Sequence, residues 1–424
     1  MSTRTTSVCW AVAALVALVP AGAFASGFSI YEQGGKASGV AGAFTALADD
    51  ASANWYNPAA LVWMEGRQFQ AGINLITAGG DTELDVLDPN FGVFTPTTFE
   101  PESSIETPVH FYYTHKVNSN IAWGLGVTTP FGLVTDWQVR PITFSARKSE
   151  LTTFVVNPNV AFRMTETWSV AVGVDYIFAD VGEFSREVPI DLDGNPLNGF
   201  EVIGSSNLSG DGDDIGWNVA ISRRTATSAF GLSYRSDLSP DIDGQIDYAN
   251  FGPLTPFFPS SPGSTTVNLP AQAAIGWAFQ VGRKTWVEVD VAWAEWSAFE
   301  SIDVDIDNET NLSRDFIIEE NWDDTFSYRV GVFWETSPTA EWRFGAVLDE
   351  SPVPEEFLRP SIPDAERTGF TLGYGHTGNK WNVDAYYMAL FFDDITALPL
   401  NEGVVAGTYE TFVHLAGVSL NYKF

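Results

Sequence analysis

Apolar and polar residues alternate with a period of two in one segment after another, from residue 67 to the end of the chain. In the last segment, the even positions from 414 to 424 are mostly apolar or aromatic, and the odd positions from 417 to 423 are small or polar. Side chains on one face of a β-strand have this spacing. The pattern predicts about fourteen strands, near residues 67–78, 107–117, 120–128, 150–164, 166–178, 213–224, 228–237, 268–281, 284–296, 325–335, 341–349, 367–376, 380–392 and 411–424.

The connections between these predicted strands are alternately short and long. Residues 118–120, 165–167 and 282–284 form short ones, whereas 179–212 and 238–267 are long and polar or Pro-rich. Tight turns on one side and long loops on the other are typical of a transmembrane β-barrel. A closed barrel also leaves no strand edge without hydrogen-bond partners in lipid. The alternative is a secreted soluble β-protein, since a sandwich alternates as well.

Tryptophan follows most of the short turns, at Trp123, Trp168, Trp286, Trp342 and Trp381. These residues predict an aromatic girdle at one membrane interface, and the terminal Phe424 fits the same arrangement. Trp286 differs in phase because its own face carries Glu288 and Asp290. It therefore faces the lumen, or a bulge shifts the register.

The first 25 residues predict a secretory signal peptide. Arg4 precedes an apolar stretch from Val8 to Val19, and residues 23–25 form an A-x-A cleavage pattern, so cleavage is expected after Ala25. The only cysteine, Cys9, lies inside this segment. The mature chain therefore has no thiol, which excludes disulfides and Cys-ligated metals. We expect the protein in the outer membrane of a Gram-negative bacterium.

Acidic residues outnumber basic ones, with 54 Asp and Glu against 21 Lys and Arg and a formal net charge of −33. Such an excess repels phosphate and excludes a nucleic-acid partner. Most acids lie in the predicted long loops, and no apolar run after residue 25 is long enough for a membrane-spanning helix. We therefore expect the acidic residues to form a polar cap of loops at one end of an apolar band of strands.

About fourteen strands enclose a lumen that barrel side chains alone do not fill. The segment 26–66 is rich in Gly and Ala and ends in Asn57-Pro58-Ala59, a sequence typical of a fixed turn. We expect it to plug the lumen; a periplasmic arm is the alternative. The predicted fold is thus all-β, a 14-stranded antiparallel transmembrane β-barrel (67–424) with an N-terminal plug (26–66) behind a signal peptide (1–25).

Several short motifs resemble one known family. Gly27-Phe28-Ser29-Ile30-Tyr31-Glu32-Gln33, Asp49-Asp50-Ala51 and Asn57-Pro58-Ala59 are similar to the N-terminal hatch of the long-chain fatty acid transporter family of outer-membrane proteins. Further similar motifs follow in the family's order: Pro130-Phe131-Gly132-Leu133, Asn268-Leu269-Pro270, Trp296-Ser297, Ser351-Pro352-Val353-Pro354 and Ile362-Pro363-Asp364. Together they span nearly the whole mature chain.

The resemblance implies uptake of hydrophobic molecules through the outer membrane. In this family, ligand passes from a groove among the extracellular loops to a pocket in the barrel, and movement of the hatch N-terminus releases it sideways at a kink in the third strand. The hatch residues would be Gly27, Phe28, Glu32, Asp49, Asn57, Pro58 and Ala59, and the kink would be Pro130, Phe131 and Gly132. An ordinary strand end entering a loop is the alternative for the kink.

Four apolar residues in a Pro-rich loop are groove candidates: Phe251, Leu254, Phe257 and Phe258. Packing of the loop on itself explains them equally simply. Arg186 lies within a residue of an arginine in fatty-acid members, and would pair with a ligand carboxylate. The lysine expected before the tenth strand is absent, so a neutral or aromatic hydrocarbon remains open as the substrate.

No sequence feature predicts catalysis, a cofactor or a metal. The four histidines lack metal-ligand spacing, and no G-x-S-x-G motif or P-loop occurs. Two acidic series, Asp303-Asp305-Asp307 and Asp191-Asp193, could bind Ca²⁺, although solvated loops are the expected explanation. We expect a monomeric transport protein, not an enzyme, whose partners are a long-chain fatty acid or another hydrophobic molecule, outer-membrane lipid and lipopolysaccharide. The competing classes are an outer-membrane lipid hydrolase and an adhesin or structural barrel.

Overall fold

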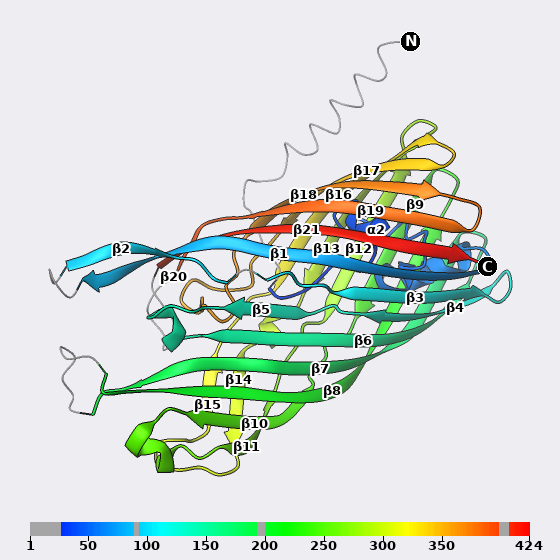
Figure 1. Cartoon of the computed structure of the whole chain (residues 1–424). Helices are drawn as coiled ribbons and strands as arrows, with labels where there is room; N and C mark the ends of the chain where they lie inside the picture. The colour runs from blue at the N-terminus through cyan, green and yellow to red at the C-terminus, as the bar shows by residue number, and fades with distance from the viewer. Residues whose placement is uncertain (1–26, 89–92, 103, 193–199, 398–406) are drawn as a thin grey trace.

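The computed structural model describes residues 27–88, 93–102, 104–192, 200–397 and 407–424, so the predicted signal peptide lies outside the described residues. Long strands run side by side around a barrel (Figure 1). Long loops extend from one end of the barrel, and the C-terminus lies at the other end.

Within the described residues, fourteen antiparallel strands form the barrel wall, and the pairing of the first with the last closes it. They match the predicted segments in number and order. They are β1 (Arg67–Asp88), β3 (Val109–Lys116), β4 (Ile121–Thr128), β6 (Lys148–Arg163), β7 (Trp168–Ile190), β8 (Val202–Arg224), β9 (Ser228–Arg235), β12 (Gln272–Gln280), β13 (Thr285–Ala294), β16 (Thr325–Ser337), β17 (Ala340–Asp349), β18 (Arg367–Thr377), β19 (Trp381–Phe392) and β21 (Gly407–Lys423).

The loop end contains more β-structure than the sequence predicts. Strands β7 and β8 continue well beyond the predicted limits. Shorter strands prolong the wall there: β2 (Val93–Phe99), β5 (Gly132–Asp136), β10 (Asp241–Ala249), β11 (Ser261–Thr266), β14 (Ser301–Ile306), β15 (Phe316–Glu319) and β20 (Ile395–Ala397). Acidic and small residues dominate these segments and hide the apolar period. Among the described residues, no helix has the length and apolar character to cross a membrane.

The barrel exposes apolar side chains and buries polar ones. In β21, Val418 and Leu420 are 40% and 45% exposed, whereas Ser419 and Asn421 between them are buried. A soluble sandwich requires the opposite arrangement, so this pattern indicates a lipid-facing wall. Trp123, Trp168, Trp342 and Trp381 are exposed on the outside, as a girdle requires. Trp286 instead packs against the apolar cluster inside the barrel, which decides its orientation.

The N-terminal segment, residues 27–66, packs against the inner face of the wall. It contains the short helices α2 (Gly35–Ser38) and α3 (Ala53–Tyr56) and the 3₁₀ turn η1 (Pro58–Trp63). Its apolar residues form one cluster with inward-facing alanines of six strands: Ala122, Ala161, Ala171, Ala220, Ala229 and Ala278. In Figure 1 the blue segment with α2 lies within the outline of the barrel. Small wall residues allow its backbone to approach closely.

Gly231 of β9 is one such position, and we expect Gly231→Ala to destabilise the protein. A Cβ atom there would lie far inside the van der Waals radius of the Thr45 carbonyl oxygen, a backbone atom that no side-chain rotation can move. Overpacking of this kind costs about 1–3 kcal/mol. The midpoint of urea unfolding should therefore fall. Gly79→Ala, where a Cβ has nothing within 4 Å, is the control. Equal midpoints for both variants would contradict the packing described here.

Candidate functional site

Two carboxylates of β13 hold the middle of the N-terminal segment. Asp290 accepts hydrogen bonds from the backbone N–H groups of Phe44 and Thr45, at 3.0 and 2.9 Å. Glu288 accepts from those of Ala46 and Leu47, at 2.6 and 3.1 Å. Both carboxylates are buried. Four consecutive backbone amides are thus held by two carboxyl groups of one strand.

The predicted motif Asn57-Pro58-Ala59 is a second attachment. The Asn57 amide donates to the carbonyl oxygens of Thr45 and Ile221, at 2.8 and 3.1 Å, and its side-chain oxygen accepts from the Ala59 N–H at 3.1 Å. Pro58 begins η1, where a missing N–H costs no helical hydrogen bond. Asn57, Pro58 and Ala59 are all buried. The motif therefore joins the segment to itself and to β8.

Two further predicted hatch residues are charged. Asp49 forms an ion pair with Lys36 at 2.8 Å, within the N-terminal segment. Burial raises the pKa of Asp49, but the Lys36 ammonium, its hydrogen bond and the guanidinium groups of Arg224 and Arg343 together bring that pKa below its usual value. Glu32 accepts a hydrogen bond at its backbone oxygen from the Asn74 amide, at 2.6 Å. Burial raises the pKa of the Glu32 carboxyl, although the Arg367 guanidinium opposes the change.

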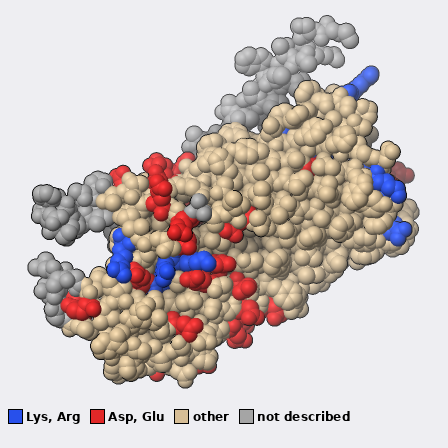
Figure 2. Space-filling view, in the orientation of Figure 1, with Lys and Arg blue, Asp and Glu red and all other residues tan. Residues whose placement is uncertain are grey.

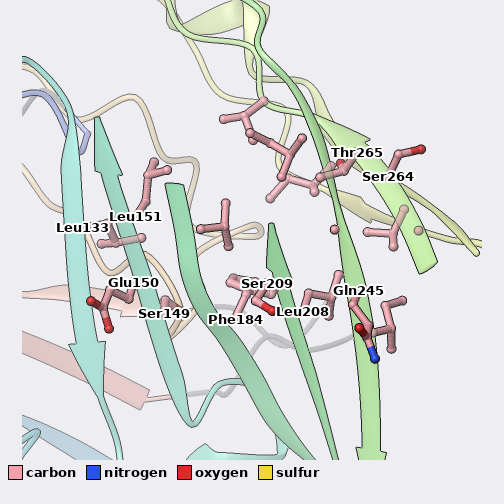
Figure 3. Close-up of a pocket in the computed structure, with 18 of the residues that line it drawn as sticks. Leu133, Ser149, Glu150, Leu151, Phe184, Leu208, Ser209, Gln245, Ser264 and Thr265 are labelled. Carbon is pink, nitrogen blue, oxygen red and sulfur yellow. The ribbon is translucent and has the colours of Figure 1, made fainter. Parts of the chain in front are cut away.

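An apolar cavity of about 90 Å³ lies near the loop end (Figure 3). Side chains of β5, β6, β7, β8, β10 and β11 surround it, including Leu133, Leu151, Phe184 and Leu208. Among the described residues, Glu150 is the one charged residue that lines it, and its carboxylate pairs with Lys148 at 2.5 Å. The lining offers an apolar ligand extensive contact and offers a carboxylate no direct cation.

The wall is interrupted between β4 and β5, at the predicted kink. Thr128 pairs with Val155 of β6 and Gly132 pairs with Thr152, so residues 129–131 lie opposite only two residues of β6. Instead of continuing the ladder, this stretch pairs with the N-terminal segment. The Ile30 N–H donates to the Pro130 oxygen at 2.7 Å, and the Gly132 N–H donates to the Phe28 oxygen at 3.1 Å.

A second cavity, of about 430 Å³, lies beside this interruption. Its lining includes Glu32 from the inside of the barrel and Phe154, an outward-facing side chain that is 42% exposed. Its lining therefore combines residues from both faces of the wall. The predicted kink residues Phe131 and Gly132 line it as well.

Phe28 lies between the two cavities and lines both. Its ring contacts four other aromatic rings, with centroid distances of 4.9 Å to Trp296, 5.7 Å to Phe299, 5.8 Å to Trp322 and 6.1 Å to Phe131. The neighbouring Gly27 N–H donates to the Asp364 carboxyl at 2.8 Å. Burial raises the pKa of Asp364 to about 7, and Arg367 opposes that change.

The loop aromatics are placed differently from the groove prediction. Phe251 and Phe258 are buried and stacked on each other, with centroids 3.8 Å apart, so packing of the loop on itself accounts for them. Leu254 is half-buried in the same loop, and Phe257 is exposed beside a polar surface hollow. Arg186 is exposed on β7, opposite Ser206. None of these five residues lines either apolar cavity.

The acidic series fall on the loop strands. Asp303 and Asp305 lie in β14, and Asp193 lies outside the described residues. In the part of the chain that is described, no three His, Cys, Asp or Glu residues gather as a metal site would require.

The sequence and the fold are similar to those of known outer-membrane proteins. The sequence profile of the outer membrane protein transport protein family (OMPP1/FadL/TodX) matches residues 16–424. The chain belongs to this family. The resemblance found in the motifs is therefore confirmed, and the protein transports hydrophobic compounds in the Gram-negative outer membrane. Members of this family are transporters and channels, not enzymes.

Its relatives match over almost their whole length. The long-chain fatty acid transport protein of Escherichia coli O6:H1 is 26% identical, with 100% of both chains covered. A putative outer membrane protein of Neisseria meningitidis is 24% identical over 96% of this chain and 97% of the other. Among solved structures, a Pseudomonas aeruginosa FadL homologue has a TM-score of 0.84 at 18% identity, covering 94% of this chain and 100% of the other. The Pseudomonas putida toluene transporter TodX has a TM-score of 0.68 at 15% identity, covering 95% and 99%. These structures share the fold.

Sequence reasoning missed the roles of Glu288, Asp290 and Asp364. The first two were visible only as acids that broke the expected phase of β13, and Asp364 only as part of a motif. Two carboxylates on an inward strand face, opposite a segment with many small residues, are a usable signal for backbone attachment.

We expect Glu288→Leu to loosen the N-terminal segment. The substitution leaves the buried N–H groups of Ala46 and Leu47 without an acceptor, at about 1–3 kcal/mol for each. Trypsin should then cleave after Lys36, which is largely covered in the folded protein, faster than in the unmodified chain. Glu335→Leu removes the same carboxylate at an exposed position and should leave cleavage unchanged. Unaltered protection of Lys36 in Glu288→Leu would refute the anchoring role.

Proposed function

We propose that this protein binds a hydrophobic molecule in the smaller apolar cavity and releases it sideways through the wall beside Phe131. One observation carries the proposal: the two cavities share Phe28, Leu133, Leu151 and Ile362 as lining residues. Displacement of one ring, that of Phe28, would join them. A molecule could then pass from the barrel interior to lipid without entering water, which an apolar solute favours.

The N-terminal segment would act as a plug with one fixed part and one movable part. Residues 44–47 and 57–59 are held by carboxylates and amides of the barrel and of the segment itself. Residues 27–30 depend on three backbone hydrogen bonds, to Pro130, Gly132 and Asp364, besides ring contacts. Movement of residues 27–30 alone would open the path while the rest of the lumen stays filled.

A long-chain fatty acid is the first substrate candidate, supported by the long-chain fatty acid transport proteins that match the whole chain. A neutral or aromatic hydrocarbon is the second, favoured by a cavity whose lining includes Glu150 and no Lys or Arg. Neither Phe251 nor Arg186 enters this proposal, because neither lines a cavity.

A strain that lacks the protein should take up less hydrophobic solute than one that expresses it. We expect expression of the unmodified chain to restore accumulation of radiolabelled oleate, of toluene, or of both. Oleate alone supports the fatty-acid candidate, and toluene alone supports the hydrocarbon candidate. If accumulation of both solutes is the same with and without the protein, the transport proposal fails for these substrate classes.

A disulfide between residues 29 and 131 should block release. Ser29 and Phe131 form an antiparallel bridge flanked by the two hydrogen bonds at residues 30 and 132, which makes them a non-hydrogen-bonded pair. Such pairs have Cα atoms about 4.5 Å apart, within disulfide range. Since Cys9 lies in the predicted signal peptide, Ser29→Cys with Phe131→Cys gives the mature chain just that pair.

Cells that carry the oxidised double variant should take up no more substrate than the deletion strain, and dithiothreitol should restore uptake. Each single variant serves as a control and should be insensitive to oxidation. Full transport by the oxidised, demonstrably cross-linked protein would rule out movement of residues 28–30 as the release step.

A further inference from the structure

Charge is divided between the two ends of the barrel. Basic residues gather at the short turns and strand ends: Arg67, Lys116, Arg163, Arg223, Arg224, Arg283, Lys284, Lys380 and Lys423. Acidic residues gather at the loop end, where Figure 2 shows most of the red side chains together with some blue ones, whereas the visible side chains at the opposite end are mainly blue. Short turns of outer-membrane barrels face the periplasm. The basic end therefore meets the headgroups of the periplasmic leaflet.

Aromatic rings form a continuous row just above these cations. Trp381 contacts Tyr422 at 4.5 Å, Tyr422 contacts Phe424 at 4.9 Å, Phe424 contacts Tyr113 at 6.3 Å and Tyr113 contacts Trp123 at 5.3 Å, between ring centroids. The row crosses β19, β21, β3 and β4, with β1 between β21 and β3. These side chains lie on the lipid-facing side of the wall, where an interfacial girdle belongs.

Two cations lie over this row. The Arg67 guanidinium is 5.8 Å from the centre of the Phe424 ring, and the Lys380 ammonium is 5.7 Å from that of Tyr422. Arg67 shares the outward face of Phe69, because Gln68 and Gln70 point inward. The consecutive N–H groups of Lys423 and Phe424 donate to the carbonyl oxygens of Lys380 and Arg67, at 2.7 and 3.1 Å. The two cations therefore flank the end of a single strand.

Neither cation is neutralised by an acidic side chain in the described part of the chain. Glu65 is paired with Lys116 at 2.6 Å, and Asp384 is paired with Arg343 at 2.7 Å on the inner face. The outer surface here therefore combines an apolar aromatic band with two cationic side chains that have no acidic side-chain partner among the described residues. An anionic amphiphile with its phosphate at the rim and its acyl chains against the rings complements both features.

We propose that Arg67, Lys380 and the ring row (the rim patch) bind an anionic phospholipid of the periplasmic leaflet. The phosphate accepts hydrogen bonds from the guanidinium and the ammonium, and the acyl chains lie along Trp381, Tyr422, Phe424 and Tyr113. A zwitterionic lipid brings its own ammonium to the same place and loses the advantage. This inference depends on the barrel's position in the membrane and not on which solute is transported.

The test measures lipid retained by the purified barrel. Protein folded in vesicles of equal phosphatidylglycerol and phosphatidylethanolamine is extracted in detergent, and native mass spectrometry gives the ratio of the two bound lipids. We expect phosphatidylglycerol to predominate. The double variant Arg67→Gln with Lys380→Gln should lower the ratio by at least about fivefold, the effect of losing one cation near an anionic surface.

The matched control is Arg283→Gln with Lys284→Gln, at the turn between β12 and β13. It removes the same charge from a place where the described residues provide no ring beneath the cations. The control should keep the wild-type ratio. Equal loss in both double variants would mean diffuse charge and no rim patch, and absence of any preference in the unmodified protein would overturn the proposal.

Heat-dependent migration on gels verifies that each variant has folded. If the Arg67 and Lys380 double variant fails to fold, Lys380→Gln alone decides the matter, because Lys380 lies in an exposed turn. A lowered ratio in that variant supports the rim patch, and an unchanged ratio refutes it.

Discussion

Lipid supplies no hydrogen bonds, and this one constraint determines most of the structure. Every backbone group in the wall must find a partner in a neighbouring strand, which forces the barrel to close through β1 and β21. Closure turns apolar side chains outward and leaves a polar interior that is too wide to fill itself. The N-terminal segment occupies part of that interior, and its backbone N–H groups donate to the carboxyl groups of Glu288 and Asp290.

The same constraint explains why the wall can be interrupted at one place. Residues 129–131 leave the ladder of β4, yet the Pro130 oxygen and the Gly132 N–H bond to residues 28–30 instead. Thr153 adds a side-chain partner for both the N–H and the oxygen of Phe131, at 3.1 and 2.7 Å. Residues 28–30 therefore supply hydrogen-bond partners to the strand at the place where its ladder is interrupted, and the proposed release step relies on that contact.

Much of the fold was predictable because its period is strict. In β21 the alternation is clear from His414 to the end of the chain, so the facing of its side chains follows from sequence, although the strand begins at Gly407, four residues before the predicted start. Strand β10 was not predicted, since Asp241, Asp243 and Asp247 occupy most of its exposed positions and the other face has only Ile242, Ile246 and Tyr248 as large apolar or aromatic residues. The interior site was harder still. Groups 242 residues apart in the sequence meet there, as the Glu288 carboxyl and the Ala46 backbone N–H do, and a periodic pattern contains no information on such pairs.

The four carboxylate-held amides have a consequence for assembly. Glu288 and Asp290 are close together on the inner face of one strand, and two such carboxyl groups buried without partners are costly. Residues 44–47 supply those partners. A barrel that closes around this segment is therefore favoured over one that closes empty.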